Sequence, residues 1–307
     1  RQAWLMAARP QTLPAGAAPV ILGVGLAVAD GVFAPAPALA ALVGALLIQV
    51  GTNFANDYYD AMKGADTEDS EGFTRVTAGG LIEPEQVRRA TVGTFGLALL
   101  VGTYLVYVGG LPIVVVGLAS IAAGVLYTGG PYPYGYYGLG DLFVFVFFGL
   151  VAVTGTYYVQ AVTTAAAGPL PAWIPAGTVT VDAVLAGSAA GALATCILVV
   201  NNIRDRETDR EAGKRTLAVI IGYRLSRVEY AGLLALAYAV PLAFWARGYG
   251  LSALTPLVTL PLAALVTRTV CSRTDTEALN PALERTGQLL ALYAALFALA
   301  LAVPEGL

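Results

Sequence analysis

The feature that most constrains this chain is a series of apolar stretches, each about as long as a bilayer is thick. An α-helix needs about 20 apolar residues to cross the hydrocarbon core of a membrane. Such stretches are found at residues 13–30, 36–56, 90–109, 111–128, 140–163, 182–202, 228–246, 252–270 and 286–303. We therefore predict an all-α integral membrane bundle of nine transmembrane helices, in which residues 1–307 form a single domain.

The composition agrees with a membrane protein and excludes several other classes. Of the 307 residues, 57% are hydrophobic and 12% are charged, whereas a soluble domain has about 25% charged residues. The net charge of −3 leaves no basic surface for a nucleic acid. The chain has no His, and both Cys residues lie in apolar stretches. Histidine metal sites, Ser-His-Asp triads and cysteine zinc sites are therefore excluded.

The positions of the basic residues predict the orientation in the membrane. If nine helices alternate and the N-terminus lies inside, only Arg247 of the 17 Lys and Arg residues falls on the outside. Such an excess of positive charge is typical of cytoplasmic segments. We therefore expect an integral protein of the plasma membrane, with its N-terminus inside and its C-terminus outside.

A first polar cluster follows the second apolar stretch. If that helix continues, Asn53, Asn56, Asp57 and Asp60 share one face, and Lys63 follows one turn later. Polar groups at membrane depth are costly and usually functional. Four further acids lie beyond the predicted helix end at Gly64, and the alternative for them is a solvated loop: Asp66, Glu68, Asp69 and Glu71.

A second polar cluster occupies residues 201–216, after the sixth apolar stretch. Read as one helix, it places Asn202, Asp205 and Asp209 in one stripe. Asp205 has no basic residue three or four positions away, which is unusual for a helix that only faces water. The alternative is a salt-bridged surface helix.

Carboxylates and amides without His or Cys are typical of a site for a hard cation. Mg²⁺ prefers oxygen ligands and often shares its coordination with substrate phosphates. Two carboxylates about 4 Å apart repel by about 4 kcal/mol at an effective dielectric constant near 20, so two facing acidic clusters need a cation between them. The neighbouring Lys and Arg residues supply donors for phosphate oxygens. We therefore expect Mg²⁺ and a lipid-tailed diphosphate at the cytoplasmic mouth of the bundle, and no obligate protein partner.

Motifs along nearly the whole chain resemble a known family. They occupy residues 4–13, 19–23, 56–66, 126–130, 138–141, 147–149, 201–217 and 284–286. The chain resembles the UbiA superfamily of intramembrane prenyltransferases, and within it the menaquinone branch, the 1,4-dihydroxy-2-naphthoate polyprenyltransferases. The run at 201–217 is the most specific of these motifs. The resemblance implies Mg²⁺-dependent transfer from a polyprenyl diphosphate to 1,4-dihydroxy-2-naphthoate, with release of diphosphate and CO₂.

The resemblance also implies roles for individual residues. The predicted metal ligands are Asn56, Asp60, Asp66, Asp205 and Asp209. The four aspartates among them are also predicted to be catalytic. Asp66 follows Asp60 by six positions rather than four, which fits the naphthoate branch. The predicted substrate-binding residues are Asn53, Asn56, Lys63, Arg75, Tyr134, Asn202, Arg204, Lys214 and Arg215.

Further candidates have both a functional and a structural interpretation. Tyr127 and Tyr134 line the acceptor site or face an allylic cation, and Tyr127 is predicted to be catalytic. The alternative is an interfacial aromatic belt, which is also the alternative for Tyr132, Tyr136 and Tyr137. Asp141 is the one charge in its span; it caps a helix or, as its family-like Gly-Leu-Gly-Asp motif favours, acts as a catalytic residue in the cavity.

Polar residues outside the two clusters also have two interpretations. Arg9, followed by Pro as in the family, is an interface anchor or part of the site. Gln49 and Gln160 orient the acceptor or bind neighbouring helices.

Two other functions fit the same sequence. One is the same fold and mechanism with another aromatic acceptor, such as homogentisate or 4-hydroxybenzoate. The other is a secondary transporter, because intramembrane acids and amides also mark ion pathways. Transporters often carry inverted repeats with broken helices at the midplane, whereas here the polar residues gather at one face.

Overall fold

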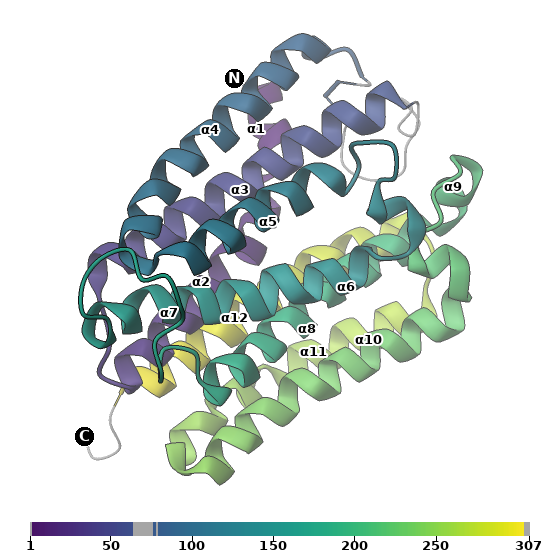
Figure 1. Cartoon of the computed structure of the whole chain (residues 1–307). Coiled ribbons are helices and arrows are strands. Elements are labelled where there is room, and N and C mark those ends of the chain that lie inside the picture. The colour runs from purple at the N-terminus through teal and green to yellow at the C-terminus, as the bar shows by residue number, and fades with distance from the viewer. Residues whose placement is uncertain (1, 64–75, 78, 304–307) are drawn as a thin grey trace.

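The computed structural model describes residues 2–63, 76–77 and 79–303, and within these ranges it is helical with no strand. The helices run side by side along one common direction (Figure 1). They are α1 (Gln2–Ala8), α2 (Leu13–Ala29), α3 (Pro35–Met62), α4 (Pro84–Gly109), α5 (Leu111–Leu126), α6 (Gly140–Phe145), α7 (Ala152–Ala165), α8 (Val181–Arg204), α9 (Arg206–Glu211), α10 (Leu217–Phe244), α11 (Leu260–Ser272) and α12 (Thr276–Ala302). Short 3₁₀ and π segments join or interrupt them: η1 (Pro10–Thr12), η2 (Tyr134–Tyr137), η3 (Val146–Val151), η4 (Trp245–Tyr249) and η5 (Leu251–Thr259).

Among the described residues, seven helical segments are long and apolar enough to cross a membrane. The bent pair α1–α2 makes an eighth, and the apolar helix α5 is shorter. A helix lies at each of the nine predicted positions, but α10 and α12 begin at Leu217 and Thr276, earlier than predicted. The all-helical membrane fold is thus confirmed, while the number of crossings and their orientation stay predictions.

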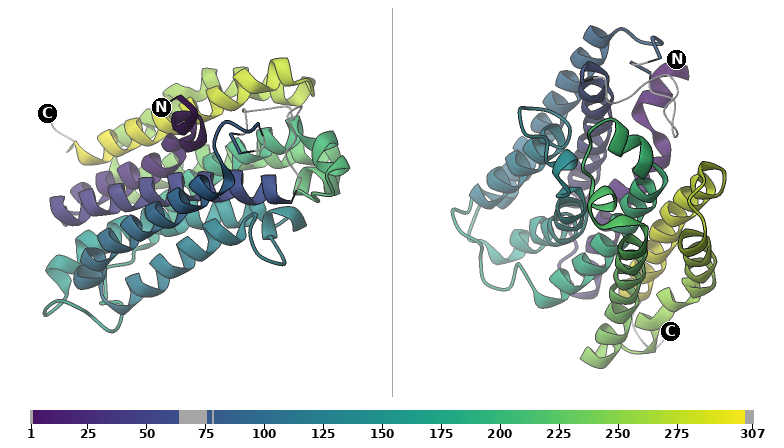
Figure 2. Two further views of the ribbon diagram at one scale, coloured as in Figure 1. Left: turned by 90° about the horizontal axis from the view of Figure 1, so that it is seen from above. Right: turned by 90° about the vertical axis from the view of Figure 1, so that its right-hand side faces the viewer.

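The helices form two groups around a central layer. In Figure 1, α3, α4 and α5 lie on one side and α10 and α11 on the other, with α8 and α12 between them. Figure 2 shows the same bundle from two further directions, and the right-hand view looks along the helices. The end of α3 and the short helix α9 lie at the same end of the bundle.

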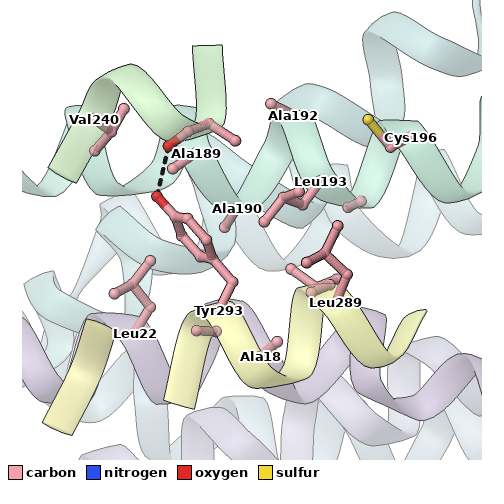
Figure 3. Packing of buried hydrophobic residues seen from close by; sticks show 14 of the residues in the cluster. Ala18, Leu22, Ala189, Ala190, Ala192, Leu193, Cys196, Val240, Leu289 and Tyr293 are labelled. Atoms are coloured by element: carbon pink, nitrogen blue, oxygen red, sulfur yellow. Dashed lines mark hydrogen bonds between the residues drawn. The ribbon is translucent and has the colours of Figure 1, made fainter. Parts of the chain in front are cut away.

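The centre of the bundle is packed closely because α8 is made largely of small residues. Its Ala and Gly residues bring neighbouring backbones into contact, and a Cβ on Gly191 would lie 2.5 Å from the Phe145 carbonyl oxygen. Large side chains of other helices fill the remaining space (Figure 3). Among them, the Tyr293 hydroxyl donates a 2.6 Å hydrogen bond to the Ala237 carbonyl, so its polar atom is satisfied inside the core.

Both polar clusters lie at helix ends, although their backbones differ. Helix α3 continues without a break to Met62, as predicted. The 201–216 segment, in contrast, is not one helix, because α8 ends at Arg204 and Asp205 has φ −91° and ψ 6°. The segment is therefore not one continuous helix, and the chain bends at Asp205 before α9 begins.

Candidate active site

A cavity of about 710 Å³ runs through the half of the bundle that contains α3, α4, α5, α7 and α8. Its two ends differ in chemistry, since one is lined by polar side chains and the other by apolar ones. Ten of the predicted site residues line it together: Asn53, Asn56, Asp60, Tyr127, Tyr134, Asn202, Arg204, Asp205, Asp209 and Lys214. The two polar clusters, about 150 residues apart in sequence, therefore face one cavity from opposite walls.

Asp60 lies at the centre of the wall formed by α3. Its side chain is only 4% exposed, and Oδ1 accepts a 2.6 Å hydrogen bond from the Tyr136 hydroxyl. Its Oδ2 lies 3.4 Å from Nζ of Lys214, which comes from the opposite cluster. The Lys214 ammonium also lies 5.1 Å from the centre of the Tyr136 ring. A single carboxylate thus links both polar clusters to the 134–137 turn.

Lys63 lies behind Tyr136 rather than on the cavity wall. Its Nζ donates to the carbonyl oxygens of Thr128 at 2.6 Å and Gly130 at 3.3 Å, and it lies 5.2 Å from the Tyr136 ring centre. The pKa of Lys63 is lower than that of an ordinary lysine. Partial burial is the main cause; the negative charge of Asp60 opposes it, and the positive charge of Lys214 adds to it. In this structure Lys63 therefore holds the 128–130 turn against α3.

The two asparagines of α3 also connect the cavity wall to its surroundings. Oδ1 of Asn56 accepts a 2.9 Å hydrogen bond from the Thr128 hydroxyl. Nδ2 of Asn53 donates to the Ala8 carbonyl and to Oγ1 of Thr12, each at 2.9 Å. Asn53 thereby fixes the bend between α1 and α2 against the wall of the cavity.

On the opposite wall, the carboxylate of Asp205 is neutralised by the residue next to it in the sequence, Arg204. Nε and Nη2 of Arg204 donate to the two carboxylate oxygens of Asp205 at 2.6 and 2.7 Å. Arg204 also donates to Asn201 at 2.9 Å and to Asn280 of α12 at 2.8 Å. Its side chain is 3% exposed. Asp205 has no basic residue three or four positions away, and its partner is instead the adjacent Arg204 at the bend between α8 and α9.

Asp209 and Lys214 are brought together by a tight turn after α9. The backbone N–H of Lys214 donates to the Asp209 carbonyl at 2.8 Å, and Gly213 has a φ of 76°, which favours glycine. This turn directs Lys214 back toward Asp60. Arg215, the next residue, is exposed and is not among the cavity-lining residues. Only its backbone N–H contacts the site, through the Tyr136 carbonyl at 3.0 Å.

Aromatic rings form the next layer of the cavity. Tyr134 stacks on Phe143, with ring centres 4.0 Å apart, and packs edge-on against Tyr127. Its hydroxyl donates to the Ala123 carbonyl at 2.6 Å.

Asp141 lies outside the cavity, which corrects the expectation that it is one of the lining residues. It is 6% exposed, and neither carboxylate oxygen has a hydrogen-bond partner within the described residues. If the neighbouring Gly140 were replaced by a residue with a Cβ, that atom would lie 3.4 Å from the Tyr127 hydroxyl oxygen. The backbone next to Asp141 therefore packs against Tyr127, which does line the cavity.

Three other candidate residues of the first cluster and the segment after it are not found in the cavity wall that the structure describes. Asp57 is buried and accepts from the N–H groups of Val76 and Thr77 at 3.2 and 3.1 Å, and also from the Thr77 hydroxyl. It anchors the chain after the first cluster instead of lining the cavity. Asp66 and Arg75 lie outside the described residues.

Sequence reasoning missed some of the lining residues. Tyr136 was assigned to an interfacial belt together with Tyr132 and Tyr137, which are indeed 78% and 54% exposed. No periodicity distinguishes neighbouring tyrosines in a turn, so only the fold separates them. Thr128 also lines the cavity, and the Tyr-Thr-Gly-Gly run is the signal that the sequence offers for it. Arg9 lines the cavity as well, in agreement with the predicted alternative that it is part of the site.

The donors at the polar end fit Mg²⁺. Carboxylates of Asp60, Asp205 and Asp209 and the amide of Asn56 offer only oxygen ligands, the type that Mg²⁺ prefers. In the described part of the chain, no group of three acidic, His or Cys residues forms a closed metal cluster. An ion here would share its coordination with phosphate and water, as Mg²⁺ commonly does.

The other end of the cavity reaches the outer surface of the bundle. Leu99 of α4 and Leu118 of α5 line the cavity and are 48% and 56% exposed. Gly102 and Gly117 line the same region, and a Cβ on either would meet no other atom within 4 Å. An apolar chain has room to pass between these helices toward the lipid.

Comparison with known proteins agrees with this architecture. The model of the UbiA prenyltransferase family matches residues 17–292. A 1,4-dihydroxy-2-naphthoate octaprenyltransferase from Escherichia coli is 40% identical over 297 residues, covering 93% of this chain and 90% of that protein. One from Mycobacterium tuberculosis is 38% identical, covering 97% and 96%.

A solved structure shares the fold at low sequence identity. The UbiA homologue from Archaeoglobus fulgidus bound to GPP and Mg²⁺ superposes with a TM-score of 0.63 at 16% identity, covering 98% of this chain and all of that one. The family model and the close relatives extend over nearly the whole chain. This chain therefore belongs to the UbiA prenyltransferase family.

Proposed function

We propose that this protein transfers a polyprenyl group from a polyprenyl diphosphate to 1,4-dihydroxy-2-naphthoate. The observation that carries the proposal is the single cavity with a charged end and a lipid-facing apolar end. A lipid-tailed diphosphate matches both ends at once. The names of the close relatives supply the acceptor. We further propose that residues 1–307 form one domain.

The charged end would bind the diphosphate head. Asn56, Asp60, Asp66, Asp205 and Asp209 are the residues that would hold Mg²⁺. When bound, the ion supplies positive charge that stabilises the leaving diphosphate. Lys214 is the cation of the described wall that points at Asp60, and it would contact a phosphate oxygen. Arg204 would act indirectly, by holding Asp205 in place.

The reaction begins when the allylic C–O bond breaks and its electron pair leaves with the diphosphate. The ring carbon that carries the carboxylate then attacks the allylic cation, and the bond from that carbon to the carboxylate breaks, so that its electron pair returns to the ring as CO₂ leaves. The faces of Tyr127 and Tyr134 would stabilise the cation, since aromatic rings attract positive charge. Asp141, buried outside the cavity, would act on the site through its charge and would not touch the substrate.

The location of the site follows from the distribution of charge. We propose that the charged end opens to the cytoplasmic side of the plasma membrane. The concentration of Lys and Arg residues on that side of the predicted topology supports this orientation.

The proposal is tested with purified protein, Mg²⁺, geranylgeranyl diphosphate and 1,4-dihydroxy-2-naphthoate, with mass spectrometry of the products. We expect a prenylated, decarboxylated product that disappears when EDTA is added. Turnover with homogentisate or 4-hydroxybenzoate alone would contradict the acceptor assignment. Release of no diphosphate with any acceptor would contradict the enzymatic function.

A further inference from the structure

A second polar group lies inside the cavity, away from the diphosphate end. Gln49 and Asp60 both belong to α3 and both line the cavity. Gln49 comes 11 positions before Asp60. At about 1.5 Å per residue, this places Gln49 about 16 Å from Asp60 along the helix. Arg9, at the bend between α1 and α2, lines the cavity at the level of Gln49 and Asn53.

These residues are held by a hydrogen-bond network centred on Thr12. Its Oγ1 accepts from Nε2 of Gln49 at 3.0 Å and from Nδ2 of Asn53 at 2.9 Å, and it donates to the Arg9 carbonyl at 2.8 Å. Gln49 is 6% exposed. Thr12 therefore links the Arg9 backbone to the Gln49 side chain, although the two residues lie 40 positions apart in sequence.

Two polar atoms of this network remain unsatisfied. Oε1 of Gln49 and Nη2 of Arg9 are both buried, and neither has a hydrogen-bond partner within the described residues. Unpaired buried polar atoms are rare because each has lost its hydration without gaining a partner. Arg9 also has φ 51°, a left-handed conformation that is strained for a residue other than glycine. Such strain often marks a binding site.

The unsatisfied pair has a defined chemical complement. It offers one cationic donor and one neutral acceptor among the residues that line one cavity. An aromatic ring that carries a carboxylate beside a hydroxyl matches it, because the carboxylate accepts from a guanidinium and the hydroxyl donates to an amide oxygen. An isoprenoid tail offers neither group, and the diphosphate has its own basic residue, Lys214, at the other end.

We propose that Arg9 binds the carboxylate of the aromatic acceptor and that Gln49 accepts a hydrogen bond from the adjacent ring hydroxyl. This inference rests on the proposed function and makes the two residues determinants of acceptor specificity. It places the acceptor on the α2–α3 side of the cavity, with its ring between this pair and the charged end.

The test compares two acceptors that differ only in the carboxylate: 1,4-dihydroxy-2-naphthoate and 1,4-dihydroxynaphthalene. We expect Arg9→Gln to raise KM for the naphthoate at least about tenfold, because a charged hydrogen-bond partner is lost. KM for the carboxylate-free acceptor and for geranylgeranyl diphosphate should change less than about twofold. Arg9→Lys keeps the charge and should restore part of the naphthoate affinity.

A second variant separates the two roles. Gln49→Glu keeps the size of the side chain but adds a negative charge, so it should weaken binding of the naphthoate more than binding of the carboxylate-free acceptor. Arg88→Gln is the matched control, since Arg88 is an exposed arginine paired with Glu85 outside the cavity. Melting temperatures of all variants identify any that fail to fold.

The outcomes are distinct. An Arg9→Gln protein with equal losses for both acceptors, or with a raised KM for the diphosphate, would overturn the inference and leave the proposed function standing. Wild-type protein that prenylates neither acceptor would overturn both.

Discussion

The two walls at the charged end of the cavity use the same residue types but neutralise their acids differently. On the α3 wall, Asp60 is balanced by Lys214, which belongs to the other wall. On the α8–α9 wall, Asp205 is balanced by the adjacent Arg204. The first acid is therefore satisfied only when the tertiary structure has formed, whereas the second is satisfied by its own chain segment.

This difference has a functional meaning. An ion pair that spans the cavity can open when a cation and a diphosphate arrive, because its partners move independently. A pair between neighbouring residues, with Arg204 bonded also to Asn201 and Asn280, is rigid. We therefore assign Asp60 and Lys214 to the binding chemistry and Arg204 to the support of the wall.

The largest effect is expected from the acids that face each other. Asp60→Asn and Asp209→Asn should each lower kcat about a thousandfold, because each removes a charge that holds the cation at the leaving group. Steady-state kinetics with saturating substrates measure this loss. Asp57→Asn is the matched control. It should lower the melting temperature more than kcat, because Asp57 bonds the backbone at Val76 and Thr77.

The ion pair across the cavity gives the next effect. Lys214→Met should raise KM for the diphosphate and reduce kcat/KM about a hundredfold, since a charge-assisted contact and the link between the walls are both lost. A double-mutant cycle with Asp60→Asn should show strong coupling. Additive losses would mean that the two side chains act independently.

The local pair should respond differently. Arg204→Gln leaves the carboxylate of Asp205, which is 16% exposed, without its cation, so it should destabilise the protein by about 2 kcal/mol. KM for the diphosphate should change much less than in Lys214→Met. Thermal unfolding and steady-state kinetics of both variants distinguish the supporting role of Arg204 from the binding role of Lys214. An unaltered melting temperature for Arg204→Gln would contradict the assignment of Arg204 to the support of its wall.

A smaller effect is expected at the apolar end. Gly102→Leu should lower kcat/KM about tenfold for a long polyprenyl diphosphate and leave dimethylallyl diphosphate almost unaffected, because the new side chain fills the path between α4 and α5. Competition between the two donors measures the ratio directly. Gly93→Leu, on the same helix but outside the cavity, is the control.

The smallest effect concerns pH. Because partial burial lowers the pKa of Lys63, this residue loses its proton at a lower pH than an ordinary lysine. Above that pH its charged bond to the Thr128 carbonyl is lost, and kcat/KM should fall a few-fold. Lys63→Arg stays charged, so its profile should remain level to a higher pH. If kcat/KM of the wild type and of Lys63→Arg fell at the same alkaline pH, Lys63 would not control the turn.

Much of the fold was predictable from the sequence, because apolar length decides where a helix can cross a membrane. All nine apolar stretches coincide with helices, and the extension of α3 through Asp60 followed from the spacing of its polar residues. The choice of acids, amides and bases without His likewise indicated a cation and a phosphate. Both inferences use local information: hydropathy, periodicity and residue chemistry.

Only the tertiary structure decided which polar residues meet. At the bend before α9, Arg204 bonds to Asn280 of α12, a contact that no helical periodicity predicts. Tyr136 is separated from Tyr132 and Tyr137 by the packing of one turn against Lys63 and Lys214. Asp141 is in the predicted span, yet the fold buries it behind Tyr127. Side-chain direction and burial depend on neighbours distant in sequence, and the sequence pattern therefore named the chemistry but not the partners.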